Sequence, residues 1–339
     1  MPGFARVPGA VLPEVARSVF MDATLFRAAL AAGDPMLLDG GLATQLEAQG
    51  ADLSDRLWSA RLLIEEPQAI AAAHLAFYRA GARVATTASY HAMFEGFAAR
   101  GIDHAAAEAL LRRSVDLALE ARARHLAELD RAALPAPAPL FVAASVGPYG
   151  AMLADGSEYR GNYGRSVAEL RDFHRARLDV LADTPADVLA VETIPELQEI
   201  EAVTALLAGR PAAAAWISVT CADGARLRGG ATVEEAALAS AASPASASSP
   251  GVVAVGVNCT PPVFVEEIVA RMRSVTSLPI VVYPNSGEGW DASARRWTGG
   301  ASERVDASAA TRWRAAGAML IGGCCRVTPD QIAGLAAGR

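Results

Sequence analysis

Short apolar runs alternate with longer amphipathic segments along most of the chain. Eight runs rich in Val, Leu, Ile and Ala each end in small or polar residues, and segments with helical periodicity lie between them. Near-continuous apolar strands between helices are typical of a parallel sheet covered on both faces. Eight such repeats predict an α/β fold of one domain, a (β/α)8 TIM barrel. An open doubly wound sheet is the alternative that the pattern leaves open. The runs are 36–38, 83–87, 140–145, 188–191, 214–220, 252–257, 279–283 and 318–321.

The alternation begins some way into the chain. Residues 1–21 are rich in Pro and Gly, and we expect them to form a poorly ordered extension. Residues 22–339 then form the barrel domain, which opens with a short helix over 22–32. A longer polar stretch, 287–302, follows the seventh run, and loops of this length are often active-site lids. The helical patterns between the runs are 67–80, 105–127, 166–182, 195–207, 232–239, 262–274 and 307–316.

Composition narrows the classes of protein. Of the 339 residues, 52% are hydrophobic, which supplies enough apolar material for a core and excludes wholesale disorder. The net charge of -7 gives no reason to expect a nucleic-acid partner. All 30 basic residues are arginine, so the chain has no lysine for a phosphate-binding loop or for a Schiff base with pyridoxal phosphate.

The chain shows no sign of a membrane or secretory destination. Glu14 and Arg17 interrupt the apolar stretch near the start, so it does not read as a signal peptide. No uncharged run approaches the ~20 residues that span a bilayer. We therefore expect a cytoplasmic protein without a membrane partner, whose thiols are reduced and are available for metal binding or catalysis.

Three of the four cysteines stand where predicted strands end. Cys259 follows the sixth run, and Cys324 and Cys325 follow the eighth. The carboxyl ends of barrel strands converge at one mouth, so three thiolates there, with a fourth position open, predict a catalytic Zn²⁺ site. Two small buried hydrophobic residues or a vicinal disulfide are the other interpretations of Cys324 and Cys325. Cys221 is predicted to be a packed thiol.

The charge of such a centre indicates its chemistry. Zn²⁺ with three thiolates has a net charge of about −1, which suits it poorly to polarise a carbonyl. It can still bind a substrate thiol and remove its proton. The electron-rich sulfur that results suits alkyl transfer from an activated donor.

Two carboxylates also stand at predicted strand ends. Asp39 follows the first run and Glu192 the fourth. Either could simply cap a turn or a helix. Two acids at the rim of one mouth fit binding of a substrate ammonium group.

Nine sequence stretches, in this order, resemble the homocysteine S-methyltransferase family, in particular the branch that uses S-methylmethionine as methyl donor. The likeness extends from about residue 22 to residue 337. The stretches are LLDGGLAT (37–44), TASY (87–90), GFAARG (96–101), SVGPYG (145–150), LADGSEYRG (153–161), ET (192–193), NC (258–259), VVYPNSGE (281–288) and GGCCR (322–326).

The resemblance implies a (β/α)8 barrel with a catalytic Zn²⁺ held by Cys259, Cys324 and Cys325. It also implies that Asp39 and Glu192 contact the amino group of homocysteine. We further assign the rim residues of these stretches to substrate binding. They are Gly40, Gly41, Thr87, Ser89 and Asn258.

The expected function is transfer of a methyl group from a sulfonium donor to the thiol of L-homocysteine, giving methionine. The donor is S-methylmethionine or, as an alternative, S-adenosylmethionine, and the protein is expected to be a monomer or a small homo-oligomer. A sulfonium cation favours aromatic faces, for which the candidates are Tyr90, Tyr149, Tyr159 and Trp290.

Two other functions stay open. The same zinc chemistry could methylate another thiol or a selenol, such as selenocysteine. Alternatively, the vicinal pair Cys324 and Cys325 could serve a non-catalytic zinc-sensing or redox-sensing barrel. Polar residues at all eight predicted strand ends argue against a sensor, which needs only the thiols.

Overall fold

Each of the eight predicted apolar runs forms a parallel strand of one sheet. The computed structural model describes residues 21–33, 35–53, 59–134, 138–210, 213–242, 251–291, 296–298, 300 and 304–337. The strands are β1 (Met36–Leu37), β2 (Val84–Thr86), β3 (Phe141–Val146), β4 (Val188–Ile194), β5 (Ala214–Val219), β6 (Gly251–Asn258), β7 (Ile280–Tyr283) and β10 (Ala318–Ile321).

The sheet curls into a barrel. Its strand order is β1-β10-β7-β6-β5-β4-β3-β2. A parallel bridge between Leu38 and Val84 brings the two outermost strands together. The prediction of a TIM barrel is therefore confirmed, and the open doubly wound alternative is wrong.

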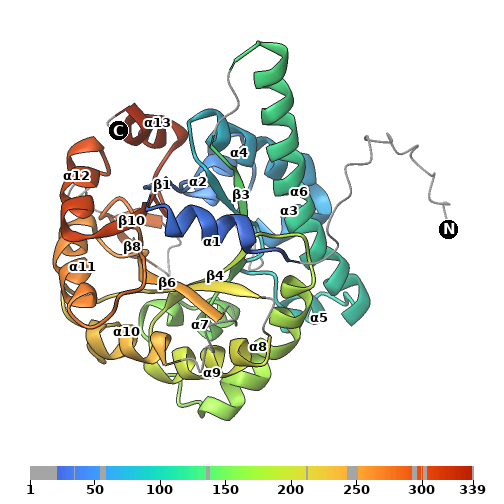
Figure 1. Cartoon of the computed structure of the whole chain (residues 1–339). Helices are drawn as coiled ribbons and strands as arrows, with labels where there is room; N and C mark the ends of the chain where they lie inside the picture. The colour runs from blue at the N-terminus through green and yellow to red at the C-terminus, as the bar shows by residue number, and fades with distance from the viewer. Residues whose placement is uncertain are drawn as a thin grey trace.

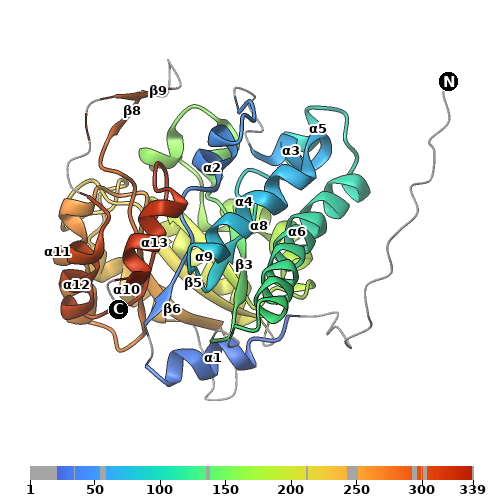
Figure 2. The same cartoon turned by 90° about the horizontal axis from the view of Figure 1, so that it is seen from above.

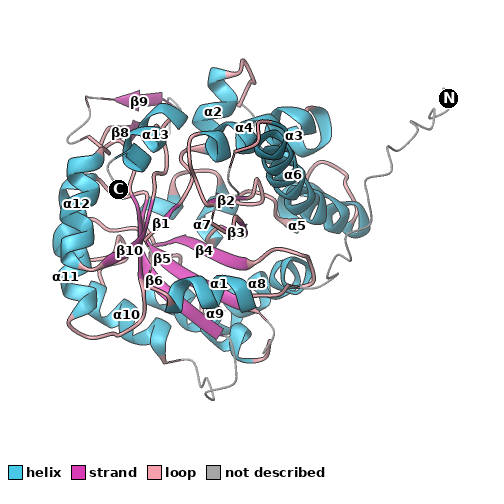
Figure 3. Ribbon diagram, turned by 45° about the horizontal axis from the view of Figure 1, so that its top comes forward, coloured by secondary structure: helices cyan, strands magenta, loops and turns pink. Residues whose placement is uncertain are grey.

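Helices form a ring around the strands (Figures 1 and 3). The seven long helices predicted between the runs are all present, with their ends shifted by a few residues. They are α4 (Pro67–Arg79), α6 (His104–Arg131), α8 (Val167–Ala182), α9 (Leu197–Ala208), α10 (Val233–Ala241), α11 (Val265–Arg273, after η2, Pro262–Phe264) and α12 (Ala307–Ala316). Six further helices in the described part of the chain were not predicted, and all of them except α13 hold seven residues or fewer, too few to show a period. They are α2 (Leu42–Ala48), α3 (Ser59–Glu65), α5 (Phe94–Ala98), α7 (Tyr149–Leu153), η1 (Ser157–Tyr159) and α13 (Pro329–Ala337).

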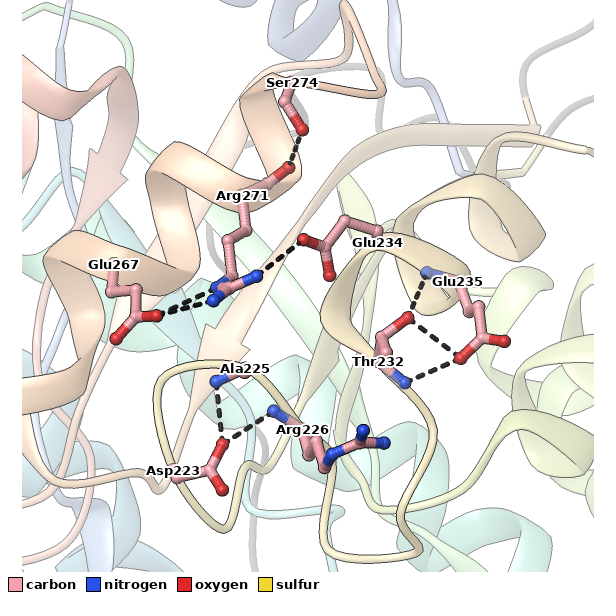
Figure 4. A network of polar contacts seen from close by, with 9 residues as sticks. All are labelled: Asp223, Ala225, Arg226, Thr232, Glu234, Glu235, Glu267, Arg271 and Ser274. Atoms are coloured by element: carbon pink, nitrogen blue, oxygen red, sulfur yellow. Dashed lines mark hydrogen bonds and ion pairs between the residues drawn. The ribbon is translucent and has the colours of Figure 1, made fainter.

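Charged side chains join neighbouring helices of the ring. The Arg271 guanidinium on α11 contacts Glu267 one turn earlier at 2.8 Å and Glu234 on α10 at 3.0 Å (Figure 4). Thr232 and Glu235 form a capping box at the start of α10. The loop that leads from β5 into α10 is thus fixed at its end.

Helix α1 (Thr24–Ala31) closes one end of the barrel, and the helix predicted over 22–32 is confirmed. Phe26 on this helix is fully buried, and its ring meets Phe141 of β3 edge-on at 5.2 Å. Figure 2 shows α1 at the end of the molecule opposite to β8 and β9. The amino-terminal end of the barrel is therefore filled by side chains.

The polar stretch after β7 contains structure of its own. Strands β8 (Gly289–Asp291) and β9 (Arg296–Thr298) pair antiparallel as a small separate sheet. This pair lies on the far side of the barrel from α1 (Figure 2). The lid function expected for 287–302 stays a prediction.

Side chains that point into the barrel change from apolar to polar along most of the strands. In β4, Val188 and Ala190 belong to the interior cluster, whereas Leu189 and Val191 pack outward against the helices. Because side chains alternate between the two faces of a strand, Glu192 is the next inward position. The same count places polar or thiol side chains at the carboxyl ends of other strands. They are Thr86, Ser145, Ser218, Asn258, Tyr283 and Cys324.

The predicted extension 1–21 lies outside the described residues, except for Met21, so that boundary stays a prediction. Among the described residues, no helix is both long and apolar enough to cross a membrane.

Candidate metal centre

The three cysteines predicted to bind a metal lie together at the carboxyl end of the barrel. The Sγ atom of Cys325 is 3.9 Å from that of Cys259 and 3.9 Å from that of Cys324. All three sulfur atoms lie within 4.8 Å of one another. Cys259 is buried, whereas Cys324 and Cys325 are half-buried, so the cluster is reached from one side.

The donor set fits a tetrahedral zinc ion. Zinc–sulfur bonds of about 2.3 Å place the corners of a tetrahedron about 3.8 Å apart, close to the two sulfur–sulfur distances of 3.9 Å. Contacts with Cys259 and Cys324 lower the pKa of the Cys325 thiol. Hydrogen bonds with Cys259 and Cys325, together with burial, raise the pKa of Cys324, and repulsion by a neighbouring thiolate adds to the increase. A divalent cation relieves that repulsion, and Cys259, Cys324 and Cys325 would hold it.

Cys259 is directed by an uncommon backbone conformation. Its φ is +46°, and Thr193 at the end of β4 has a φ of +62°. Left-handed conformations cost about 1–2 kcal/mol in residues other than glycine, so the surroundings must hold them in place. Asn258 holds Thr193, since its Oδ1 accepts the Thr193 amide at 2.7 Å and its Nδ2 donates to the Thr193 hydroxyl at 2.8 Å. Its amide group thereby ties β4 to β6 beside Cys259. The Cys259 amide donates to the Tyr283 carbonyl at 3.3 Å, and the Cys259 carbonyl accepts the Thr220 hydroxyl at 3.2 Å.

Gly40 and Gly41 let the first strand approach the loop that carries Cys324. A Cβ atom at Gly40 would lie 2.5 Å from the Val327 carbonyl oxygen, and one at Gly41 would lie 2.7 Å from the Cys324 oxygen. The Gly41 amide also donates to the Val327 carbonyl at 2.9 Å. These contacts explain both glycines through packing, and their contact with substrate stays a prediction.

Asp39 is buried at the end of β1 and faces β2. One carboxylate oxygen accepts the Thr86 amide at 2.7 Å, and the other accepts the Thr86 hydroxyl at 3.0 Å. Burial raises the pKa of Asp39 to about 8 against these hydrogen bonds, and the charge of Glu192 adds to the increase. The carboxylate thus lacks a cationic partner among these contacts, which suits an ammonium ligand.

Glu192 occupies the inward position at the carboxyl end of β4. Its Oε1 accepts a short hydrogen bond from the Ser145 hydroxyl at the end of β3. Burial raises the pKa of Glu192 to about 7, opposed by that hydrogen bond, while the neighbouring Cys259 adds to the increase. Asp39 and Glu192 therefore form a pair of buried acids near the thiols.

Thr87 and Ser89, two other predicted substrate residues, brace the loop after β2. Their hydroxyl oxygens lie 2.7 Å apart. Thr87 accepts the Ser145 amide at 3.0 Å, and Ser89 donates to the Ser145 carbonyl at 2.8 Å. Their substrate contact stays a prediction.

Sequence reasoning missed Thr86 and Ser145, the residues that hydrogen-bond the two acids. The alternation of inward and outward side chains was the signal that could have found them.

The four aromatic candidates differ in position. Tyr90 and Tyr159 lie near Cys259, and burial raises the pKa of both hydroxyls. Tyr149 instead packs against Tyr163 and Phe173, at ring distances of 5.3 and 5.0 Å. The side chain of the fourth candidate, Trp290, lies outside the described residues.

Cys221 is separate from this cluster. Its side chain is fully buried, and burial raises the pKa of its thiol. It is the packed thiol that was predicted.

Comparison with known proteins decides the family. A sequence model described as homocysteine S-methyltransferase matches residues 36–338. The chain belongs to the homocysteine S-methyltransferase family. It is 47% identical over 312 residues to the homocysteine S-methyltransferase of Escherichia coli K12, and the alignment covers 92% of this chain and 97% of the relative.

A plant relative and a crystal structure extend the comparison within this family. The chain is 44% identical over 310 residues to the selenocysteine Se-methyltransferase of Brassica oleracea var. italica, covering 88% of this chain and 87% of the relative. The metallated crystal structure of the E. coli homocysteine methyltransferase MmuM superposes with a TM-score of 0.81 at 46% identity, over 93% of this chain and all of that one. A metal-bound member of the family thus shares this fold.

Proposed function

We propose that this protein transfers a methyl group from a sulfonium donor, S-methylmethionine, to the sulfur of L-homocysteine at a zinc centre. The observation that carries the proposal is the cluster of Cys259, Cys324 and Cys325 beside two buried carboxylates. Membership in a family whose E. coli relative is named homocysteine S-methyltransferase supports the acceptor. The metallated form of MmuM supports a metal in this site.

The acceptor is held at two points. Its α-ammonium group binds between Asp39 and Glu192, which accept hydrogen bonds from the uncharged residues Thr86 and Ser145. Its sulfur faces the three thiols. Zinc, when bound, lowers the pKa of a coordinated thiol, so that homocysteine reacts as a thiolate. Thr86 and Ser145 fix the two carboxylates and thereby the orientation of the acceptor.

The reaction is then a single displacement. The homocysteine sulfur forms a bond to the donor methyl carbon while the bond from that carbon to the sulfonium sulfur breaks. The electron pair leaves with the donor sulfur as a neutral thioether, so no general acid is required. The protein contributes alignment of the two sulfur atoms, and Tyr90 and Tyr159 offer aromatic faces for the sulfonium cation.

Zinc removal and restoration tests this proposal. Purified protein with bound zinc should convert homocysteine and S-methylmethionine to methionine, and chelation should abolish turnover. Zinc should restore it, whereas magnesium should not, because thiolate ligands select the softer ion. S-adenosylmethionine is assayed in parallel as donor. Methyl transfer that survives complete loss of metal would contradict the assignment of the thiols.

Binding of homocysteine should strengthen as pH rises from 6 to 8. Burial raises the pKa of Asp39 to about 8 and of Glu192 to about 7, so both acids carry protons at pH 6. An ammonium group favours their ionised forms, and binding therefore releases protons in this interval. We expect KM for homocysteine to fall about tenfold from pH 6 to 8. A KM that is constant over this range, or rises, would contradict the ammonium assignment.

A selenol acceptor is the second candidate, because one relative is named selenocysteine Se-methyltransferase. Selenocysteine has the same ammonium and carboxylate groups and a more acidic nucleophile. Competition between homocysteine and selenocysteine for one labelled donor would rank the two acceptors.

A further inference from the structure

An acidic side chain at the mouth of the barrel is left over after both acceptor contacts are assigned. Glu158 lies in η1, in the loop that follows β3. Its Oε2 atom is buried and has no hydrogen-bond partner in the described part of the chain. Burial raises the pKa of Glu158 to about 7, and the charges of Asp155 and Cys259 contribute to the increase. A buried carboxylate oxygen without a partner is costly, which indicates that a ligand completes the site.

The neighbours of Glu158 belong to the reaction site. Its charge and that of Cys259 both add to the increase in the pKa of the Tyr90 and Tyr159 hydroxyls. The charge of Cys259 also raises the pKa of Glu158 itself. The nearby cation, Arg160, contacts Asp155 at 3.2 Å and the Ser157 hydroxyl at 2.6 Å, and its charge partly offsets the increase in the pKa of Glu158. Among the described residues, Arg160 therefore hydrogen-bonds Asp155 and Ser157 rather than Glu158, and the Glu158 Oε2 atom is left for a ligand.

Buried charged groups on two helices hold the start of the loop that carries Glu158. Arg177 on α8 donates to the Gly147 carbonyl, and Glu199 on α9 accepts the Tyr149 amide. Glu199 is itself paired with His174 at 2.7 Å. These contacts fix the loop where it leaves β3.

The two halves of the same loop also pack closely on each other. A Cβ atom at Gly150 would lie 2.4 Å from the Glu158 amide nitrogen, so α7 and η1 touch backbone to backbone. The backbone position of Glu158 is therefore set by the fold, as a specific binding group requires.

We infer that Glu158 binds the α-ammonium group of the methyl donor and so selects amino-acid sulfonium compounds. This inference rests on the proposed function and adds the recognition of the donor to it. The sulfonium is the other cation of the donor, and its charge disappears during the reaction. A carboxylate placed against it would stabilise the ground state more than the transition state and slow the transfer. The α-ammonium keeps its charge throughout, so Glu158 can bind it without raising the barrier.

The substitution Glu158→Gln tests the inference, because glutamine keeps the shape and removes the charge. A hydrogen bond to a charged group contributes about 1.5–3 kcal/mol, so KM for S-methylmethionine should rise about 10- to 100-fold. The values of kcat and of KM for homocysteine should stay within about twofold, as expected for uniform binding. Glu158→Asp, which keeps the charge on a shorter side chain, should show a smaller rise.

Asp155→Asn is the matched control. It removes one negative charge from the same loop, and asparagine keeps the oxygen that accepts the Ser157 amide at 2.9 Å. Its KM for the donor should resemble that of the wild type. An equal rise in Asp155→Asn and Glu158→Gln would show a general loss of negative charge and would overturn the assignment.

A donor without an amino group identifies the group that Glu158 contacts. The probe is (3-carboxypropyl)dimethylsulfonium, which is S-methylmethionine without its α-ammonium. The wild type should use it with a KM raised about as much as Glu158→Gln raises that of S-methylmethionine, and the variant should treat the two donors alike. An unchanged donor KM in Glu158→Gln, or equal weakening of both donors, would overturn the inference.

Failure of the proposed function is distinguishable from failure of this inference. If the wild type transfers no methyl group from any sulfonium donor, the proposed function is wrong. Calorimetric titration of S-methylmethionine into the zinc-loaded wild type and Glu158→Gln then decides the inference by itself. Weaker binding in the variant supports it, and equal binding overturns it.

Discussion

Replacing Cys325 with alanine should abolish both metal retention and methyl transfer. The Cys325 sulfur lies 3.9 Å from each of the other two sulfur atoms, so both of these close contacts involve Cys325. Two thiolates cannot complete the tetrahedral donor set, so zinc affinity and the acidity that it gives to the acceptor thiol fall together. We expect bound zinc to fall below measurement and kcat to fall at least about 1000-fold. Metal analysis and the methyl-transfer assay, on protein whose fold is checked by circular dichroism, measure both.

Cys221→Ala is the matched control for this experiment. Cys221 is fully buried but does not belong to the metal cluster. The variant should keep its zinc and near-full turnover and lose about 1 kcal/mol of stability through the small cavity. If Cys325→Ala retained zinc and turnover as Cys221→Ala does, the three-thiolate centre would be wrong.

The second large effect is expected at the two buried acids. Asp39→Asn and Glu192→Gln should each raise KM for homocysteine about 100-fold, because each removes a charged partner of the ammonium group. Both amides keep an oxygen for the hydrogen bonds from Thr86 and Ser145, so the fold should be preserved. KM for the donor should change little.

An acceptor without an amino group gives the decisive comparison. The wild type should prefer homocysteine to 4-mercaptobutyrate, which has the same thiol and carboxylate. That preference should shrink about 100-fold in each variant. A preference retained in both variants would place the ammonium group elsewhere.

Periodicity was sufficient to predict the barrel, because each strand is covered on both faces and reads as an unbroken apolar run. It also placed Cys259 and Cys324 at one end, since parallel strands share a direction. It could not show that the Cys259 backbone turns left-handed with a φ of +46°, because its amide and carbonyl are held by Tyr283 and Thr220, which are distant in the sequence.

Some individual side chains could not be predicted either. We expected Thr87 at the mouth, yet its neighbour Thr86 holds Asp39, because adjacent residues of a strand face opposite ways. Asn258 was expected to meet the substrate, and its amide is engaged with Thr193 and Ser218. Glu158 carried no periodic signal, because it lies in a single turn of 3-10 helix within a loop.

Helix α1, which fills the amino-terminal end of the barrel, restricts how the reactants can reach the thiol cluster. Because Phe26 and its neighbours fill this end, both reactants must enter and leave at the carboxyl end of the barrel, where the thiols lie.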